Sequence, residues 1–259
     1  MILEGKTIIV SGVGPGLGLE IARIALRDGA NVVLGARNED KLQKLAADLD
    51  GSGARVAYQR TDITDPAQCE ALIAAGVDRF GGVDGLAQVA ALDAIMGGIR
   101  ETPVEDWNAS FGTNVLGPVH LVRAIAPRFH ARGGGSVVLI GSQSMYLPQI
   151  PQIAYAAAKG ALMSAMYYMA KELGPDHIRV NTVVPTWMWG PPVQGYVSYT
   201  AQAQGVPEEQ VIAGITANMP LGEIPADEDV AEAVAFLLSD RARMITGQSL
   251  FVNAGELMR

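Results

Sequence analysis

The sequence has a single cysteine, Cys69, among its 259 residues. One thiol cannot close an intramolecular disulfide or form a thiolate metal cluster by itself, so a reducing compartment is expected. No run of about 18 or more apolar residues is present, and the first residues lack the basic start and apolar core of a secretion signal. We therefore expect a cytoplasmic protein with no membrane partner.

Positive charge and histidine are also scarce. The 19 lysines and arginines are outnumbered by 27 acidic residues, which leaves a formal net charge of −8. Such a field repels nucleic acid, so no nucleic-acid partner is expected. The three histidines, His120, His130 and His177, lack the spacing of metal ligands, and we predict no metal site.

Apolar residues, by contrast, make up 49% of the chain, enough for an extensive core in one domain spanning residues 1–259. Runs rich in β-branched residues alternate with helical stretches, which indicates a parallel sheet covered by helices on both faces. The predicted strands are Thr7–Val10, Val32–Leu34, Val56–Tyr58, Leu86–Val89, Val137–Ile140, Val180–Val184 and Leu250–Val252.

Two aspartates predict helix starts. Asp65 precedes Pro66, the pattern of an N-cap followed by proline in the first turn, and Asp227 similarly opens an amphipathic run to Ser239. One segment, residues 186–225, breaks the alternation with prolines, glycines and aromatic residues that show no clear period. We predict that it is a long irregular lid over a functional site.

A glycine-rich segment follows the first predicted strand. It reads Ser11-Gly12-Val13-Gly14-Pro15-Gly16-Leu17-Gly18 and leads into the helical run Leu19–Arg27. This order of strand, turn and helix is typical of phosphate binding, because glycine permits unusual dihedrals and lets a pyrophosphate approach the backbone at the helix N-terminus. The alternative is a glycine-rich turn that binds no ligand.

Tyr155 and Lys159 are four positions apart, which places them on one face of the predicted helix Ile153–Leu173. A neighbouring cation favours phenolate and lowers the tyrosine pKa toward neutrality. Tyr155 is therefore a candidate general acid or base. The alternative is a surface pair with no catalytic role.

The chain resembles the short-chain dehydrogenases/reductases along essentially its whole length. The glycine segment fits the TGxxxGxG form of that family, with Ser11 in place of threonine. The further matching positions, in order, are Asp62, Asn114, Ser142, Tyr155-Ala156-Ala157-Ala158-Lys159 and Thr246-Gly247-Gln248. The resemblance implies a Rossmann-type, doubly wound α/β sheet of seven parallel strands flanked by helices, and NAD(P)-dependent oxidation or reduction.

The resemblance also implies roles for single residues. Tyr155 would transfer the proton, and Ser142 would bind the reacting oxygen, with Ser144 as the rival candidate. Lys159 would bind the nicotinamide ribose, and Asn114 would organise a water chain to solvent. The implied cofactor-binding residues are Gly12, Gly16, Leu17, Gly18, Arg37, Asp62, Ile63, Ala90, Tyr155 and Lys159.

The end of the second predicted strand bears on the choice of dinucleotide. Ala36 stands where NAD enzymes place an acidic residue on the ribose 2′-hydroxyl. Arg37 follows and could form charge-assisted hydrogen bonds with a 2′-phosphate, so we expect NADP(H), with NAD(H) as the alternative and a solvated Arg37 as the competing interpretation. Asp62 matches the family residue that contacts the adenine amine.

Two segments depart from the family pattern. Gln88-Val89-Ala90-Ala91 replaces Asn-Asn-Ala-Gly, which removes two asparagines that steady the sheet beside the cofactor. Pro185-Thr186 replaces Pro-Gly near the expected carboxamide. We expect altered hydrogen bonding in the first segment and an altered backbone path in the second.

The lid segment is rich in large side chains, which predicts closure over an apolar or cyclic substrate. These residues are Trp187, Met188, Trp189, Tyr196, Val197 and Tyr199. Packing of the lid on the domain, or a subunit contact, is the alternative. The resemblance further implies a homotetramer or homodimer, with the helix Ile153–Leu173 and the helix around Asn114 at the subunit contacts.

The predicted function is NAD(P)-dependent interconversion of a carbonyl and a secondary alcohol in a small-molecule substrate. The alternative is a catalytically idle dinucleotide-binding sensor or scaffold of the same fold. The combination of Asn114, Ser142, Tyr155 and Lys159 favours the enzyme.

Overall fold

A computed structural model gives the structure of the protein and describes residues 1–258. Its centre is a sheet of seven parallel strands in the order β3-β2-β1-β4-β5-β6-β7. The strands are β1 (Thr7–Ser11), β2 (Asn31–Ala36), β3 (Val56–Arg60), β4 (Gly85–Gln88), β5 (Gly135–Ile140), β6 (Ile178–Pro185) and β7 (Ser249–Val252). Every predicted strand is present, and the Rossmann-type architecture is confirmed.

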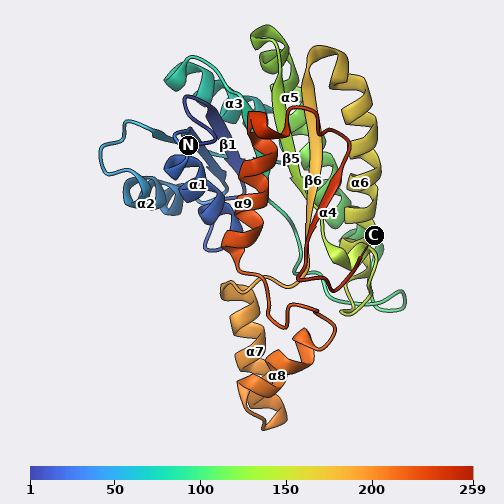
Figure 1. Cartoon of the computed structure of the whole chain (residues 1–259). Coiled ribbons are helices and arrows are strands. Elements are labelled where there is room, and N and C mark those ends of the chain that lie inside the picture. The colour runs from blue at the N-terminus through green and yellow to red at the C-terminus, as the bar shows by residue number, and fades with distance from the viewer. Residues whose placement is uncertain (259) are drawn as a thin grey trace.

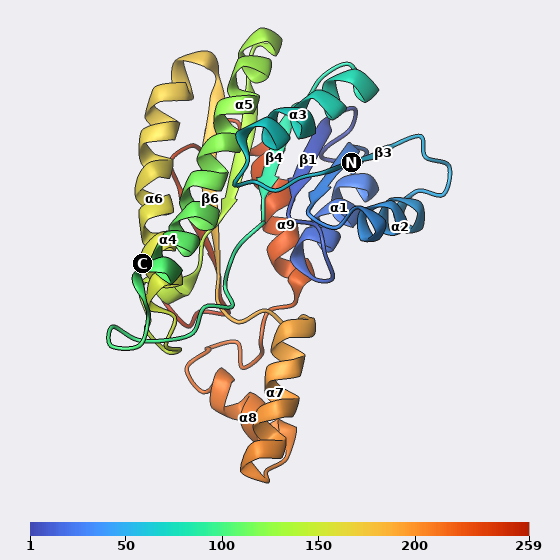
Figure 2. The same ribbon diagram turned by 180° about the vertical axis from the view of Figure 1, so that it is seen from behind.

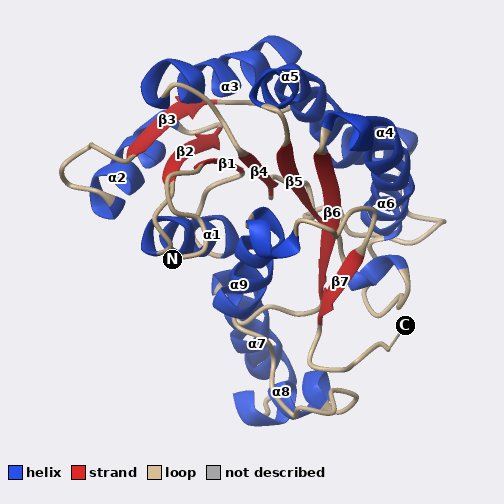
Figure 3. Cartoon of the chain, turned by 45° about the horizontal axis from the view of Figure 1, so that its top comes forward, coloured by secondary structure: helices blue, strands red, loops and turns tan. Residues whose placement is uncertain are grey.

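Helices cover both faces of the sheet (Figure 1). One face carries α1 (Leu17–Arg27), α2 (Glu39–Leu49) and α9 (Asp227–Leu238). The opposite face carries α3 (Pro66–Phe80), α4 (Val104–Phe111), α5 (Gly117–Arg132) and α6 (Ile153–Leu173), as Figure 2 and Figure 3 show.

The two faces have separate apolar cores. Ile8 and Val10 of β1 belong to the core under α1 and α9, whereas Ile9 between them belongs to the core under α3 and α5. Successive side chains of a strand point to opposite faces, so a strand buried on both sides must be apolar throughout. This explains the continuous apolar runs in the sequence.

The carboxyl edge of the sheet is where a ligand is expected. The strand order reverses at β1, which lies between β2 and β4, and α/β sheets bind ligands at such a switch point. Ser11 ends β1 and Gln88 ends β4, so the glycine segment leaves the sheet at this place.

One of the two predicted helix caps is correct. Asp65 is the N-cap of α3, and its Oδ1 accepts a hydrogen bond of 2.9 Å from the Ala67 amide. Asp227 is the first residue of α9 rather than its cap, so that prediction is wrong by one position. The N-cap is Ala226, and its amide donates to the Asp229 carboxylate at 2.8 Å.

The predicted irregular lid contains two helices, α7 (Pro191–Gln204) and α8 (Glu208–Thr216), which project beyond the carboxyl ends of the strands (Figure 1). The prediction of irregular structure is therefore wrong. Two prolines begin α7, where the missing amide hydrogen is not needed, and Gly205 ends it with a φ of +66°. Among residues 1–258, no helix is long and apolar enough to cross a membrane.

Candidate active site

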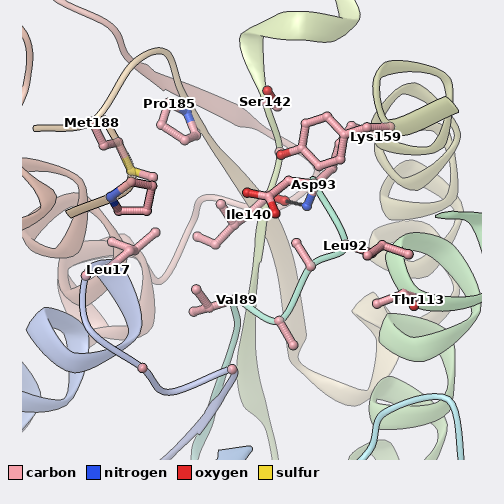
Figure 4. Close-up of a pocket in the computed structure, with 18 of the residues that line it drawn as sticks. Leu17, Val89, Leu92, Asp93, Thr113, Ile140, Ser142, Lys159, Pro185 and Met188 are labelled. Atoms are coloured by element: carbon pink, nitrogen blue, oxygen red, sulfur yellow. Dashed lines mark hydrogen bonds between the residues drawn. The ribbon is translucent and has the colours of Figure 1, made fainter. Parts of the chain in front are cut away.

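A cavity of about 920 Å³ lies at the carboxyl edge of the sheet. It extends from the glycine segment to Ser142, Tyr155 and Lys159. Figure 4 shows Leu17 at one side of this cavity, with Ser142 and Lys159 at another. The two groups of residues that the sequence assigned to phosphate binding and to proton transfer therefore share one cavity.

The glycine segment has the geometry of a phosphate loop. Gly12 and Gly16 have φ values of +97° and +113°, and Gly16 is the N-cap of α1, which begins at Leu17, two residues earlier than predicted. A Cβ at Gly12 would lie 2.2 Å from the Ala90 nitrogen. Gly12, Gly14 and Gly16 line the cavity where α1 begins, which fits a dinucleotide pyrophosphate at the helix N-terminus.

Gly18 does not line the cavity among the described residues. A Cβ at this position would lie 2.4 Å from the Gly12 oxygen. Gly18 therefore lets α1 pack closely on the loop that precedes it, and its contribution to a cofactor site is indirect.

Arg37, Asp62 and Ile63 border the cavity at the ends of β2 and β3. Arg37 is exposed, and its guanidinium forms no hydrogen bond or ion pair with another residue in the 1–258 range. The Asp62 carboxylate accepts hydrogen bonds from the Thr64 amide and hydroxyl at 3.0 and 2.7 Å. These two hydrogen bonds lower the pKa of Asp62, and the charge of Arg37 lowers it further by a smaller amount. At this end of the cavity a free cation therefore lies beside a fixed carboxylate.

The segment Gln88-Val89-Ala90-Ala91, which differs from the family pattern, keeps hydrogen bonds through other groups. Gln88 is fully buried, and its Nε2 donates to the Ala90 oxygen at 2.8 Å. The amides of Val89 and Ala90 both donate to the Ser11 oxygen at 2.8 Å. Glutamine thus replaces part of the expected asparagine network.

Asn114 lies in a π-helical turn, Gly112–Leu116, between α4 and α5. It is fully buried and does not border the cavity. Its Oδ1 accepts from the Leu92 amide at 3.0 Å, and its Nδ2 donates to the Leu92 oxygen at 2.9 Å and to Ser110 Oγ at 3.1 Å. Asn114 therefore fixes the loop after β4, and its part in a water chain stays a prediction.

Ser142, two residues after the end of β5, contacts the candidate catalytic tyrosine. The Ser144 hydroxyl donates to Ser142 Oγ at 2.9 Å, and Ser142 is in turn hydrogen-bonded to Tyr155. Burial raises the pKa of Tyr155 to about 12, while the bond with Ser142 lowers it and the charge of Asp93 raises it. In the protein alone, desolvation of the phenolate therefore outweighs the lowering expected from Lys159, and the combined effect of Lys159 and a bound nicotinamide stays a prediction.

Lys159 is almost fully buried, and its Nζ donates to the Ile140 oxygen at 2.6 Å. The nitrogen lies 5.6 Å from the centre of the Tyr155 ring. Burial lowers the pKa of Lys159 to about 8, and the charge of Asp93 raises it. The ammonium form therefore predominates at neutral pH and lies in the same end of the cavity as the phenol.

Sequence reasoning missed three acidic residues at or directly behind the cavity wall, Asp93, Asp227 and Glu256. Asp93 and Asp227 line the cavity. Glu256 accepts hydrogen bonds from Gln143 and Thr186, and so joins the C-terminal tail to the loops after β5 and β6. The one signal available for Asp93 was that it is the sole charged residue between Asp84 and Arg100.

The fold and the cavity define a dinucleotide-binding oxidoreductase, and comparison with known proteins agrees. A family described as enoyl-(acyl carrier protein) reductase matches residues 12–256. The chain is 32% identical over 253 residues to the 2,5-dichloro-2,5-cyclohexadiene-1,4-diol dehydrogenase of Sphingobium indicum, covering 98% of this chain and 96% of the relative. It is 32% identical over 260 residues to the L-rhamnose 1-dehydrogenase (NAD(P)(+)) of Azotobacter vinelandii, covering 98% of each.

Solved structures give the same result. A short-chain type dehydrogenase/reductase from Mycobacterium ulcerans superimposes with a TM-score of 0.88 at 29% identity, covering 99% of this chain and 91% of that one. An actinorhodin polyketide ketoreductase with NADPH gives a TM-score of 0.88 at 29% identity and covers 97% of each chain. The protein belongs to the short-chain dehydrogenase/reductase family, whose members are NAD(P)-dependent oxidoreductases acting on CH–OH groups.

Proposed function

We propose that the protein interconverts a carbonyl and a secondary alcohol of a cyclic substrate that has an apolar face, with NADP(H) as cofactor. The observation that carries this proposal is that Ser142, Tyr155 and Lys159 line the same cavity as the glycine segment and Arg37. A bound dinucleotide supplies the hydride for reduction, or accepts it in oxidation.

The residues at this end of the cavity divide the proton chemistry between them. Because burial raises the pKa of Tyr155 to about 12, its phenol is protonated at neutral pH and donates to the carbonyl oxygen during reduction. Ser142 orients the phenol through their hydrogen bond and binds the same oxygen. Lys159 stabilises the phenolate that remains and contacts the nicotinamide ribose.

Arg37 supports NADP(H). Its guanidinium forms no hydrogen bond or ion pair among the described residues and borders the cavity at the end of β2, where Ala36 takes the place of an acidic residue that would oppose a 2′-phosphate. A similar structure is that of a ketoreductase with NADPH, whereas a similar dehydrogenase is named for NAD(P)(+). NAD(H) is accordingly the second cofactor to test.

The cavity walls support a cyclic substrate. Leu147, Ile150, Trp187 and Met188 line the cavity and provide apolar surface on which a ring can pack. The centre of the Trp187 ring also lies 5.2 Å from that of Tyr196, so this tryptophan packs on α7 as well. We propose that α7 and α8 close this end of the cavity when a substrate binds.

The proposal also includes an oligomeric state and a cytoplasmic location. Phe111, Tyr167 and Tyr168, on α4 and α6, expose large parts of their rings, which supports a homotetramer or homodimer built on these helices. The single cysteine supports the reducing cytoplasm as the expected compartment.

The direct test is turnover. Purified protein is mixed with NADPH or NADH and a panel of cyclic ketones, and the nicotinamide absorbance is followed. Oxidation of NADPH that depends on the ketone supports the proposal. Tight NADPH binding with no turnover of any ketone supports the sensor or scaffold alternative.

A further inference from the structure

Asp93 is held in place from both sides of the cavity. Its neighbour Leu92 is fixed through both backbone polar groups by Asn114. Its own carbonyl accepts a hydrogen bond of 2.8 Å from Gln152 Nε2, directly before α6. Because these contacts come from two different elements, the position of Asp93 at the cavity is set by the fold.

The Asp93 carboxylate lies beside the proton-transfer residues. Its negative charge acts on both Tyr155 and Lys159. Figure 4 shows Asp93 near Lys159 and inside the cavity. The side chain is exposed, and within residues 1–258 its carboxylate forms no hydrogen bond or ion pair. Its oxygens are therefore free to accept hydrogen bonds from a bound molecule.

The other polar side chains that line this end are neutral, among them Ser144, Gln149, Gln152 and Thr186. Glu256 does not line the cavity, and its carboxylate already accepts hydrogen bonds from Gln143, Gln149 and Thr186. The basic residues bordering the described cavity are Arg37 and Lys159, and Arg37 is at the opposite end while Lys159 already donates to the Ile140 oxygen. A substrate carboxylate or phosphate would thus meet the Asp93 charge with no cation available to bind it.

A smaller adjoining cavity of about 380 Å³ lies against α7 and α8 and shares Gln149 and Trp187 with the first. Its lining adds the amides of Gln204, Gln210 and Asn218, and no charged side chain among the described residues. Amides both donate and accept hydrogen bonds, which suits the hydroxyl groups of a neutral molecule.

We infer that the substrate is a neutral α-hydroxy ketone, or in the oxidative direction a vicinal diol, whose second hydroxyl donates a hydrogen bond to Asp93. This inference rests on the proposed function and names the substrate class of the same site. We place the hydroxyl on the carbon next to the reacting one because Asp93 lines the same end of the cavity as Tyr155 and Lys159, and its charge acts on both. An ammonium group there would meet the Lys159 ammonium as well as the Asp93 carboxylate, whereas a hydroxyl carries no charge and needs only the acceptor that Asp93 provides.

Asp93 exchanges neither protons nor electrons with the substrate. In reduction, the carbonyl carbon receives the hydride, and its oxygen receives the Tyr155 proton, while the neighbouring hydroxyl keeps its own proton and donates it in a hydrogen bond. Asp93 is therefore a specificity-determining residue. Its hydrogen bond selects the substrate and its orientation.

The test compares three ketones with NADPH: 2-hydroxycyclohexanone, cyclohexanone and the anion 3-oxocyclohexane-1-carboxylate. We expect the wild-type protein to prefer the hydroxy ketone over cyclohexanone by about 10-fold or more in kcat/KM, as a hydrogen bond to a charged group predicts. In Asp93→Asn and Asp93→Leu this preference falls to less than about 3-fold, because the rate with the hydroxy ketone drops further than the rate with cyclohexanone. The anion is the poorest substrate of the wild type and improves relative to cyclohexanone in both variants.

Asp48→Asn, on the exposed surface of α2, is the matched control and leaves all three rates unchanged. A preference that survives in both Asp93 variants, or a wild type that turns over cyclohexanone as well as the hydroxy ketone, overturns the inference and leaves the proposed function standing.

If neither neutral ketone is turned over, the proposed function fails for these compounds, and binding then decides the inference. The protein is first saturated with NADP⁺. Calorimetry then measures its affinity for cyclohexane-1,2-diol and for cyclohexanol. Tighter binding of the diol that is lost in Asp93→Asn supports the role of Asp93. Equal binding of the two alcohols overturns it.

Discussion

The Nζ atom of Lys159 donates a hydrogen bond of 2.6 Å to the main-chain oxygen of Ile140. Ile140 is the last residue of β5, and Lys159 lies in α6, so this contact joins the strand that precedes Ser142 to the helix that carries Tyr155. It also places a cation in a buried position, which opposes folding.

This burial predicts a more stable variant. Since the pKa of Lys159 falls from 10.5 to about 8, the unfolded chain binds the proton more tightly, and the destabilisation is complete below about pH 8 and disappears as the pH rises toward 10.5. Lys159→Met should therefore increase the free energy of unfolding at neutral pH by on the order of 1 kcal/mol, or raise Tm by about 2–4 °C, with a smaller gain at alkaline pH.

The same variant should lose turnover by about 100-fold or more, because the phenolate loses its neighbouring cation. Thermal unfolding across the pH range and steady-state kinetics measure the two effects. Lys171→Met, at an exposed position of the same helix, should change neither. A lower Tm at neutral pH in Lys159→Met would contradict the unfavourable burial of the charge.

Arg37 should determine the preference between the two dinucleotides. Arg37→Ala is expected to raise the Michaelis constant for NADPH by about 10- to 100-fold, the effect of losing charge-assisted hydrogen bonds to a 2′-phosphate. The constant for NADH should change less than about 2-fold, since NADH lacks that phosphate. Arg128→Ala, exposed on α5, is the control. Equal increases in the Michaelis constants for NADPH and NADH would rule out a contact between Arg37 and the 2′-phosphate.

Asp227 should weaken cofactor binding as the pH rises. A Cβ at Gly16 would lie 3.3 Å from Asp227 Oδ2, so this carboxylate is next to the expected pyrophosphate, and burial raises its pKa. Asp227→Asn should tighten NADPH binding about 3- to 10-fold at alkaline pH, where the wild-type group is charged. At acidic pH the difference should shrink, because protonation removes the repulsion.

Fluorescence titration of NADPH across the pH range measures this effect, with Glu228→Gln on the exposed side of α9 as the control. If the ratio of the NADPH affinities of Asp227→Asn and the wild type does not depend on pH, the Asp227 charge does not act on the bound cofactor.

Glu256 should position the loops after β5 and β6, which border the end of the cavity where the substrate is expected. Its carboxylate accepts from Gln143 Nε2 at 2.6 Å, from Thr186 Oγ1 at 2.5 Å and from Gln149 Nε2 at 2.5 Å. Glu256→Ala should raise the Michaelis constant for the ketone by about 10-fold, in the range of a lost charged hydrogen bond, and leave NADPH affinity unchanged. Glu256→Gln keeps one acceptor oxygen and should rescue part of the loss. A parallel loss of NADPH affinity would instead indicate general unfolding.

Much of the fold could be predicted because its signals are local. The centre of β1, Ile8 to Val10, is buried on both faces and is therefore continuously apolar, and glycine is required at Gly12 by close approach to Ala90. Ser142 and Tyr155 were found because family motifs mark them, and the parallel sheet brings the ends of its strands to one edge.

The remaining features depend on contacts between distant parts of the chain. The loop that carries Asp93 is fixed by Asn114 and Gln152, and no local pattern around Asp93 shows this. The raised pKa of Tyr155 in the protein alone was not predicted, because a sequence shows its neighbour Lys159 but not its burial. The helices α7 and α8 were missed because α7 begins with prolines and lacks a clear amphipathic period.

The most direct test of the central claim is the turnover of Tyr155→Phe, measured as ketone-dependent NADPH oxidation beside the dissociation constant for NADPH. The account predicts that turnover falls by about 1000-fold or more while NADPH affinity stays within about 2-fold, because the ring remains and only the transferable proton is lost. Tyr168→Phe, 74% exposed on the same helix, should behave as the wild type. A Tyr155→Phe protein that oxidises NADPH as fast as the wild type would contradict the account.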